Sequence, residues 1–93
     1  MKILSISGPN LNLLGKREEK HYGKMTLDEL NTLLEKQFPE VEFTFFQSNH
    51  EGLIIDIIQT YNNYDAIMIN PAAYTHTSIG IRDALDIATI PKV

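Results

Sequence analysis

Residues 66–71 read Ala-Ile-Met-Ile-Asn-Pro, an apolar run that ends at a proline. A short uninterrupted run of this kind is typical of a strand that is covered on both faces of a sheet. A second run, at residues 3–7, ends at Gly8-Pro9 and also predicts a buried strand. Two strands covered on both faces indicate a sheet that lies between layers of other elements.

Helical periodicity follows the first predicted strand after a long connection. Thr26 and Glu29 have the spacing of a capping box, and Pro39 predicts the end of the helix that begins there. The expected apolar stripe of this helix consists of Leu27, Leu30, Leu33, Leu34 and Phe38. We expect this stripe to face the sheet.

The next two elements repeat the pattern of strand and helix. Apolar residues alternate with polar residues over positions 41–45, which predicts a strand. Ser48 and Glu51 repeat the capping-box spacing, and Asn62-Asn63 predicts a break. The stripe of this second amphipathic helix is expected at Leu53, Ile54, Ile57, Ile58 and Tyr61.

A third helix and a further extended segment follow the apolar run at 66–69. Thr77 or Ser78 is expected to cap the helix. Its predicted inner stripe is Ile81, Ala84, Leu85 and Ala88. Residues 90–93 are expected to begin another strand.

Strands that alternate with helices imply right-handed crossovers and a parallel sheet with helices on both faces. The predicted fold is therefore α/β: a flavodoxin-like three-layer sandwich with a parallel sheet, truncated after the start of strand 4. Such sheets usually have five or more strands. We accordingly expect residues 1–93 to be a single, incomplete domain rather than a naturally minimal one.

Composition excludes several classes of function. The 93 residues carry 8 Lys and Arg against 12 Asp and Glu, a net charge of −4, so no basic surface for nucleic acid is expected. No apolar run is long enough to predict a membrane span. The chain has no cysteine, which excludes a thiol nucleophile or zinc–thiolate site. Cytoplasmic localisation is the expectation.

Polar side chains follow each of the three predicted strands, in segments 8–12, 47–50 and 70–78. Because parallel strands bring their carboxyl ends to one edge, these segments are expected to meet where such folds bind ligands. Half of the basic residues lie within 16–24, part of a long loop that we interpret as a lid over this edge. The pattern predicts a site for a small polyhydroxylated or anionic molecule.

Simpler interpretations of these residues remain open. Asn10 and Asn70 follow strands, where an asparagine often does no more than form an Asx-turn. His76 is equally consistent with a surface position, and Asp83 with a role at the positive end of a helix. Neither phosphate-binding glycine motifs nor metal-ligand spacings occur, so an enzyme of this sequence is expected to use acid–base chemistry without a cofactor.

Tyr22 is an unusual candidate base in the charged loop. A phenol has a pKa of about 10, and lowering that pKa by about three units requires roughly 4 kcal/mol of preference for the phenolate. A cation about 4 Å away, at an effective dielectric constant of about 20, supplies approximately this energy. Arg17 is permanently charged and is the candidate cation, with an exposed tyrosine in a loop as the alternative.

Long stretches of the chain resemble one family, the type II 3-dehydroquinate dehydratases. The matching stretches are Gly8-Pro-Asn-Leu-Asn-Leu-Leu-Gly15, Arg17-Glu18, Tyr22-Gly23, Gln47-Ser-Asn-His-Glu-Gly52, Ile69-Asn-Pro-Ala-Ala-Tyr-Thr-His-Thr-Ser78 and Arg82-Asp-Ala84. The resemblance covers essentially the whole chain. It implies a flavodoxin-like fold, assembly of trimers into a dodecamer, and reversible dehydration of 3-dehydroquinate to 3-dehydroshikimate with neither metal nor organic cofactor.

The resemblance also implies roles for individual residues. Tyr22 would be the tyrosinate base that removes a proton next to the ketone, and Arg17 would keep it ionised. Asn10 would order a water that stabilises the enolate. The residues that would bind substrate are Asn70, His76 and, contributed to a neighbouring subunit's site, Asp83.

Two departures from the family pattern matter. Ala72 replaces a frequent glycine and tests whether that position requires a positive φ. Family members also continue beyond the equivalent of Val93 into a segment with the general-acid histidine, without which the 93-residue chain is expected to have little activity. The alternatives are a catalytically inactive binding or oligomer-forming remnant and a generic sugar-acid or nucleotide-binding module.

Overall fold

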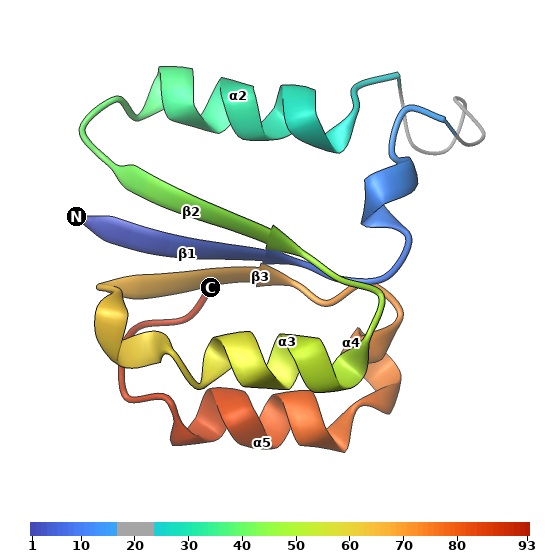
Figure 1. Ribbon diagram of the computed structural model, residues 1–93, viewed down its shortest axis with the longest axis vertical. Coiled ribbons are helices and arrows are strands. Elements are labelled where there is room, and N and C mark those ends of the chain that lie inside the picture. Colours follow the sequence, from blue (N-terminus) through green and yellow to red (C-terminus); the bar gives the residue numbers. More distant parts are fainter. Residues whose placement is uncertain (17–23) are drawn as a thin grey trace.

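The computed structural model describes residues 1–16 and 24–93. Within these ranges the strands form one parallel sheet, as predicted, and their order in the sheet is β2-β1-β3 (Figure 1). The strands are β1 (Lys2–Ser7), β2 (Glu42–Gln47) and β3 (Ala66–Asn70). All three therefore end at the same edge of the sheet.

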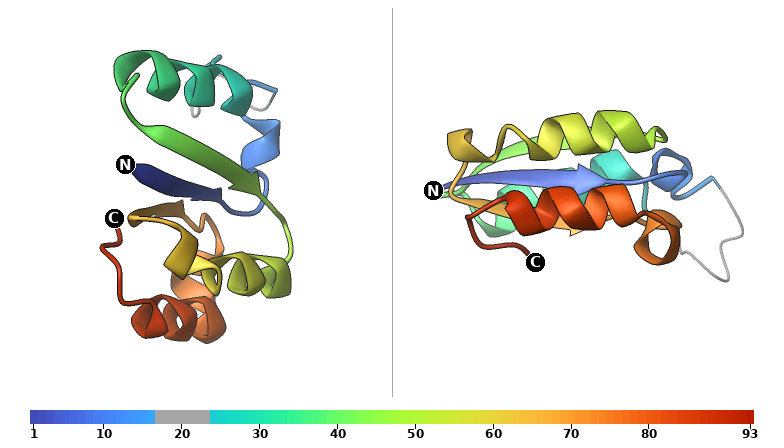
Figure 2. Two further views of the ribbon diagram at one scale, coloured as in Figure 1. Left: turned by 60° about the vertical axis from the view of Figure 1, so that its left-hand side comes forward. Right: turned by 90° about the horizontal axis from the view of Figure 1, so that it is seen from below.

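The helices lie on both sides of the sheet, with α2 on one side and α3 and α5 together on the other (Figures 1 and 2). The chain adds β2 on one side of β1 and then β3 on the other side, and right-handed crossovers place the connecting helices on opposite faces. The helical elements are η1 (Leu11–Leu13), α2 (Leu27–Gln37), α3 (Glu51–Ile58), η2 (Tyr61–Asn63), α4 (Tyr74–Thr77) and α5 (Ile79–Ile87).

The main core lies between the sheet and the α3/α5 layer. Leu4 of β1 and Ile67 of β3 are paired neighbours in the sheet and are completely buried. The other buried apolar residues of this core are Ile6, Ile54, Ile58, Ile81, Ala84 and Ala88. The expected inner faces of both helices are confirmed in large part, although Leu53 is 49% exposed and does not belong to the core.

The α2 side of the sheet is packed less completely. The predicted capping box is present, because Glu29 N–H donates to Thr26 Oγ1 (3.1 Å) and Thr26 N–H donates to Glu29 Oε1 (3.4 Å). However, α2 contains no buried residue. Three members of its expected stripe, Leu30, Leu33 and Phe38, are 38%, 40% and 47% exposed.

A cavity of about 140 Å³ explains part of this exposure. It separates the apolar residues of α2 and η1 from the sheet. Its lining includes Leu27, Leu30 and Leu34 on one side and Ser5, Ser7 and Met68 on the other. The small serines of β1 leave space that these leucines do not fill. Leu33 instead lines a pocket along the other side of α2, so the expected stripe was too broad and its burial was overestimated.

Two further expectations are corrected at loop positions. Ser48 does not cap α3 through a capping box, because its Oγ accepts a hydrogen bond from His50 N–H (2.9 Å) and the N-cap is His50. The local turn at Ser48 thus takes the hydroxyl that the spacing assigned to the helix. Residues 8–16 also contain the short helix η1, which has too few residues to show a period.

The last residues of the chain begin a fourth strand, as expected. Ile67 N–H donates to Pro91 O and Val93 N–H donates to Ile67 O, both at 2.9 Å. The segment therefore pairs with the edge of β3 that faces away from β1 (Figure 1). In the described residues, no helix is both long and apolar enough to cross a bilayer.

Candidate active site

The segments that follow the three strands are joined at the carboxyl edge of the sheet. Gly8 N–H donates to Asn70 O (2.8 Å), which connects the segments after β1 and β3. Ser48 N–H donates to Ser7 O (3.1 Å), which connects the segment after β2 to the end of β1. The predicted convergence of these polar segments is therefore confirmed.

Glycine is required at position 8 by a close approach of backbone. A Cβ atom built on Gly8 would lie 2.5 Å from the carbonyl oxygen of Pro71 and 2.7 Å from its carbonyl carbon. These are main-chain atoms, so no rotation of a side chain can relieve the overlap. Gly8 thus allows the first and third segments to touch.

Asn10 begins η1 in a left-handed conformation, with φ 68° and ψ −3°. Asparagine is among the few residues other than glycine that occupy this region readily. Its backbone N–H donates to Asn49 Oδ1 (2.9 Å), and its carbonyl accepts from Leu13 N–H (2.9 Å). In the described ranges its side-chain amide has no hydrogen-bond partner, so the main chain is fixed while the amide is available to a ligand.

Gln47 and Asn49 hold the first two segments together, a role that the sequence analysis did not assign to them. Gln47 Nε2 lies 3.2 Å from both Gly8 O and Asn49 Oδ1, and 3.4 Å from Asn12 Oδ1. The signals in the sequence were their place at the end of a strand and the match of residues 47–52 to the family pattern. Their partners are 35 to 39 residues away in sequence, a pairing that spacing alone cannot predict.

Asn70 forms the Asx-turn that was considered as its simpler interpretation. Its Oδ1 accepts a hydrogen bond from Ala72 N–H (3.1 Å). Ala72 has φ 54°, so the question whether this position requires a positive φ is answered: its backbone is left-handed. The side-chain nitrogen of Asn70 has no partner among residues 1–16 and 24–93, and this group remains available for hydrogen bonding.

His76 and Asp83 lie on the two helices that follow β3. His76 is exposed on α4, and Asp83 is exposed on α5. Neither side chain has a hydrogen-bond or ion-pair partner in the described part of the chain. The structure therefore joins the segments of Asn10 and Asn70 directly, whereas His76 and Asp83 stay outside the hydrogen-bonded cluster.

The predicted base and its cation, Tyr22 and Arg17, lie outside the described residues. The same holds for residues 17–23 of the segment 16–24, which was interpreted as a lid. Their roles stay predictions.

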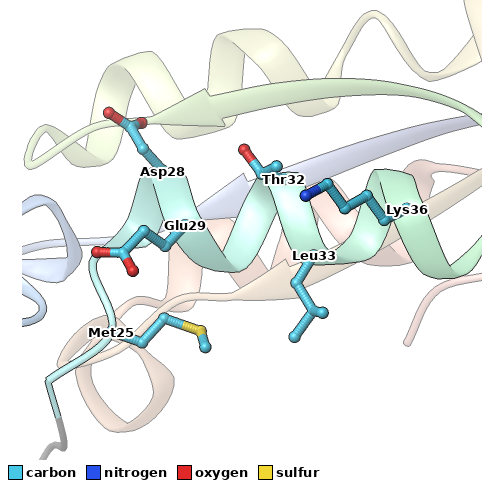
Figure 3. A pocket seen from close by; sticks show the side chains of 6 residues that line it. All are labelled: Met25, Asp28, Glu29, Thr32, Leu33 and Lys36. Atoms are coloured by element: carbon cyan, nitrogen blue, oxygen red, sulfur yellow. The ribbon is translucent and has the colours of Figure 1, made fainter.

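Two pockets lie near the start of α2 and differ in the residues that line them. One, of about 300 Å³, adjoins the polar cluster and is lined by Asn12, Lys16, Thr26, Leu27, Asp28 and Gln47. The other, of about 380 Å³, follows α2 itself, where Met25 and Leu33 extend on one side of the helix (Figure 3). Only the first contains residues of the cluster, so it is the better candidate for a ligand site.

Metal-binding side chains do not gather in the described ranges. No group of three histidine, cysteine, aspartate or glutamate residues there is arranged to hold a metal ion. The donors and acceptors at the carboxyl edge are amides, hydroxyls and backbone groups. An arrangement of this kind is suited to binding the hydroxyl and carboxylate groups of a small molecule.

Comparison with known proteins identifies the family. The family model described as "Dehydroquinase class II" matches residues 1–93. The chain belongs to the class II dehydroquinase family. The predicted resemblance is thus confirmed.

Relatives in this family are similar over nearly all of the chain. The chain is 54% identical to the 3-dehydroquinate dehydratase of Gloeothece citriformis and 51% identical to that of Geotalea daltonii, over 98% and 100% of its length. These matches span 62% and 67% of the relatives themselves. The chain therefore spans about two thirds of the length of these two relatives.

Solved class II structures confirm the fold. The type II dehydroquinase of Butyrivibrio crossotus superposes with a TM-score of 0.92 at 49% identity, over 99% of this chain and 67% of that one. The superposition confirms the predicted α/β fold, truncated relative to the solved chain. The family and the fold are thus shown.

Proposed function

We propose that this chain carries the base side of an active site that dehydrates 3-dehydroquinate to 3-dehydroshikimate in the shikimate pathway. Membership of the class II family and the names of its relatives support this reaction. The observation that carries the proposal is the carboxyl-edge cluster, in which the amide nitrogens of Asn10 and Asn70 have no hydrogen-bond partner among residues 1–16 and 24–93. Such groups suit a substrate with hydroxyl, ketone and carboxylate oxygens.

In the proposed mechanism Tyr22, as tyrosinate, removes a proton next to the ketone and an enolate forms. Arg17 lowers the pKa of Tyr22 by favouring the phenolate. Asn10 stabilises the enolate through an ordered water, which places hydrogen-bond donors where negative charge develops. Asn70 and His76 bind the hydroxyl and carboxylate groups of the substrate. Proton donation to the leaving hydroxyl belongs to a histidine in the part of the relatives that this chain does not span.

We propose that self-association of the chain brings Asp83 of one subunit to the site of a neighbouring subunit. Ile79, Asp83 and Ile87 are spaced four residues apart and therefore share one face of α5. The two isoleucines are 80% and 61% exposed. Exposed apolar side chains on both sides of a carboxylate support contact with a second copy of the chain.

The contact is tested by sedimentation. Ile79→Ser should lower the sedimentation coefficient, whereas Leu53→Ser on α3 should leave it unchanged. Equal sedimentation of all forms would contradict the contact.

The reaction is tested in an extended chain, in which residues 1–93 are followed by the C-terminal part of the Gloeothece citriformis relative. Appearance of the conjugated enone product from 3-dehydroquinate is the readout. Tyr22→Phe should reduce turnover by at least about 10²-fold, the typical contribution of a general base, and should largely preserve binding. The matched control is Tyr64→Phe, which removes a hydroxyl far from the carboxyl edge. Normal turnover in Tyr22→Phe would exclude Tyr22 as the base.

The role of Arg17 is tested through the pH–rate profile of the same extended chain. The base acts when deprotonated, so activity is present above its pKa and is lost as the pH falls through it. Without Arg17 the pKa of Tyr22 rises, and the acidic limb of the profile should move to higher pH. Lys36→Ala removes a positive charge elsewhere and should leave the limb in place. An unmoved limb in Arg17→Ala would contradict the proposed role.

The 93-residue chain measured alone tests the alternative of an inactive remnant. Binding of 3-dehydroquinate without turnover would favour a binding module that retains half of the site. Turnover comparable to that of the extended chain would contradict the expected need for the general-acid segment.

A further inference from the structure

Asn49 lies at the meeting point of all three segments that follow the strands. Its side-chain Oδ1 accepts from Asn10 N–H (2.9 Å) in the first segment. The same atom lies 3.2 Å from Nε2 of Gln47 at the end of β2. Its backbone carbonyl accepts from Tyr74 OH (3.1 Å), which comes from α4 after β3. One exposed residue thus connects every part of the candidate site.

The orientation of both side-chain amides is determined by backbone groups. Asn10 N–H can only donate, so Asn49 must present its oxygen to it. Gly8 O can only accept, so Gln47 must present its nitrogen there, 3.2 Å away. The two amides then meet as donor and acceptor, and all three hydrogen bonds are mutually consistent.

The conformation of Asn10 requires support of this kind. A left-handed residue costs roughly 1–2 kcal/mol relative to the ordinary helical region, although asparagine tolerates it better than most. The hydrogen bond from Asn10 N–H to Asn49 Oδ1 opposes a return to a negative φ. Fixing φ at Asn10 also fixes the direction in which its Cβ leaves the backbone, and so limits the positions that its side-chain amide can reach.

We propose that Asn49 is a positioning residue of the site: its Oδ1 holds the backbone of Asn10 in the left-handed conformation and thereby directs the Asn10 side chain toward the ligand. The inference rests on the proposed function for its kinetic consequences but not for its structural ones. The essential property of Asn49 is the acceptor oxygen, and its side-chain nitrogen donates to no described residue.

Substitutions at position 49 separate these properties. Asn49→Leu has a similar shape without an acceptor, and Asn49→Ala removes the group with less bulk. Asn49→Asp retains an oxygen that can accept from both donors. Asn62→Leu, at an exposed asparagine beyond α3, is the matched control for an added leucine. Hydrogen exchange measured by mass spectrometry reports on residues 8–14 directly, in the 93-residue and extended chains.

Asn49→Leu and Asn49→Ala should accelerate amide exchange in residues 8–14 with little change elsewhere. In the extended chain kcat should fall by about 10-fold or more, the usual scale for a supporting hydrogen-bond partner, while KM changes by less than about threefold. Asn49→Asp should restore exchange protection and most of kcat, with an increase in KM because its charge opposes an anionic substrate. Asn62→Leu should change none of these.

Two results would overturn the proposal. Unchanged exchange at residues 8–14 in both Asn49→Leu and Asn49→Ala would show that Asn49 does not hold Asn10. An Asn49→Asp variant as impaired as Asn49→Leu would show that the acceptor oxygen is not the essential group. If the unsubstituted extended chain has no dehydratase activity, the proposed function fails, and the exchange measurements alone decide whether Asn49 positions Asn10.

Discussion

The core on the α3/α5 side and the carboxyl edge of the sheet are maintained by different interactions. The core contains apolar side chains such as Leu4 and Ile67, which are completely buried and pack within one apolar cluster. At the edge, Asn10, Asn49 and Asn70 are exposed. Hydrogen bonds between segments join Asn10 N–H to Asn49 Oδ1 and Gly8 N–H to Asn70 O. The edge also contains both left-handed residues other than glycine found in the described ranges.

The difference indicates where stability and function reside in this molecule. Burial of apolar area makes the larger contribution to folding, whereas an exposed hydrogen bond contributes about 1 kcal/mol or less. The edge hydrogen bonds therefore act mainly by selecting one loop geometry. Substitutions in the core should change the free energy of unfolding, and those at the edge should change the geometry of the site at smaller energetic cost.

The largest expected effect is in the core. Ile67→Ala should lower the free energy of unfolding by about 2–5 kcal/mol, since it removes buried methyl groups and leaves a cavity beneath α3 and α5. Urea unfolding measures this change. If the alanine variant does not fold, Ile67→Val should cost about 1 kcal/mol and keep the protein measurable. If Ile67→Ala lowered the free energy of unfolding by less than about 0.5 kcal/mol, core residues would contribute no more to stability than the hydrogen bonds of the edge.

Gly8→Ala should have the largest effect at the edge. The new Cβ would meet the Pro71 carbonyl at 2.5 Å, so the first and third segments must move apart. We expect a loss of about 1–3 kcal/mol in urea unfolding, together with faster amide exchange in residues 8–14. Gly52→Ala is the control, because a Cβ built there has no described atom within 4 Å other than those of its chain neighbours and its own helix backbone. Equal stability of the two variants would contradict the close approach at Gly8.

Ala72→Gly should stabilise the edge slightly. Relief of the left-handed conformation is worth roughly 1–2 kcal/mol, and the greater freedom of glycine in the unfolded chain offsets about 0.4–1 kcal/mol of it. The net gain in the free energy of unfolding should be about 0.5–1 kcal/mol. Ala73→Gly, at a residue with φ −60°, should instead destabilise the chain. A loss of stability in Ala72→Gly would show that the positive φ is not a source of strain.

The smallest effect is expected on the α2 side of the sheet. Leu33→Ala should cost less than about 1 kcal/mol in urea unfolding, because its side chain is already 40% exposed and little burial is lost. Leu34→Ala, whose side chain faces the cavity above the sheet, should cost more than Leu33→Ala. A larger cost at Leu33 than at Leu34 would reverse this assignment of the two sides of α2.

Local signals predicted the elements well and the extent of packing less well. The capping box at Thr26 and the Ser78 cap of α5, in which Ile81 N–H donates to Ser78 Oγ (2.9 Å), both depend on residues three apart in sequence. The same spacing failed at Ser48, because a local turn to His50 competed for its hydroxyl. The stripe of α2 had the correct period, but its burial depended on how closely the sheet surface fitted it.

In the candidate site, too, the placement of residues was predictable from the sequence and their contacts were not. The placement of Asn10 and Asn70 at one edge followed from the alternation of strands and helices, which implies parallel strands with a common carboxyl end. The hydrogen bond between Asn10 and Asn49 could not be predicted, because it joins residues 39 apart in two loops whose register depends on the assembled sheet.

By itself the sequence determined the order of elements, the parallel sheet and the edge at which polar residues gather, because periodicity, caps and crossover handedness are local or topological properties. Tertiary structure alone decided which apolar stripe is buried, which amides are paired and which remain free. It also imposed the left-handed conformations of Asn10 and Ala72. These features depend on contacts between distant segments, which exist only once the strands have paired.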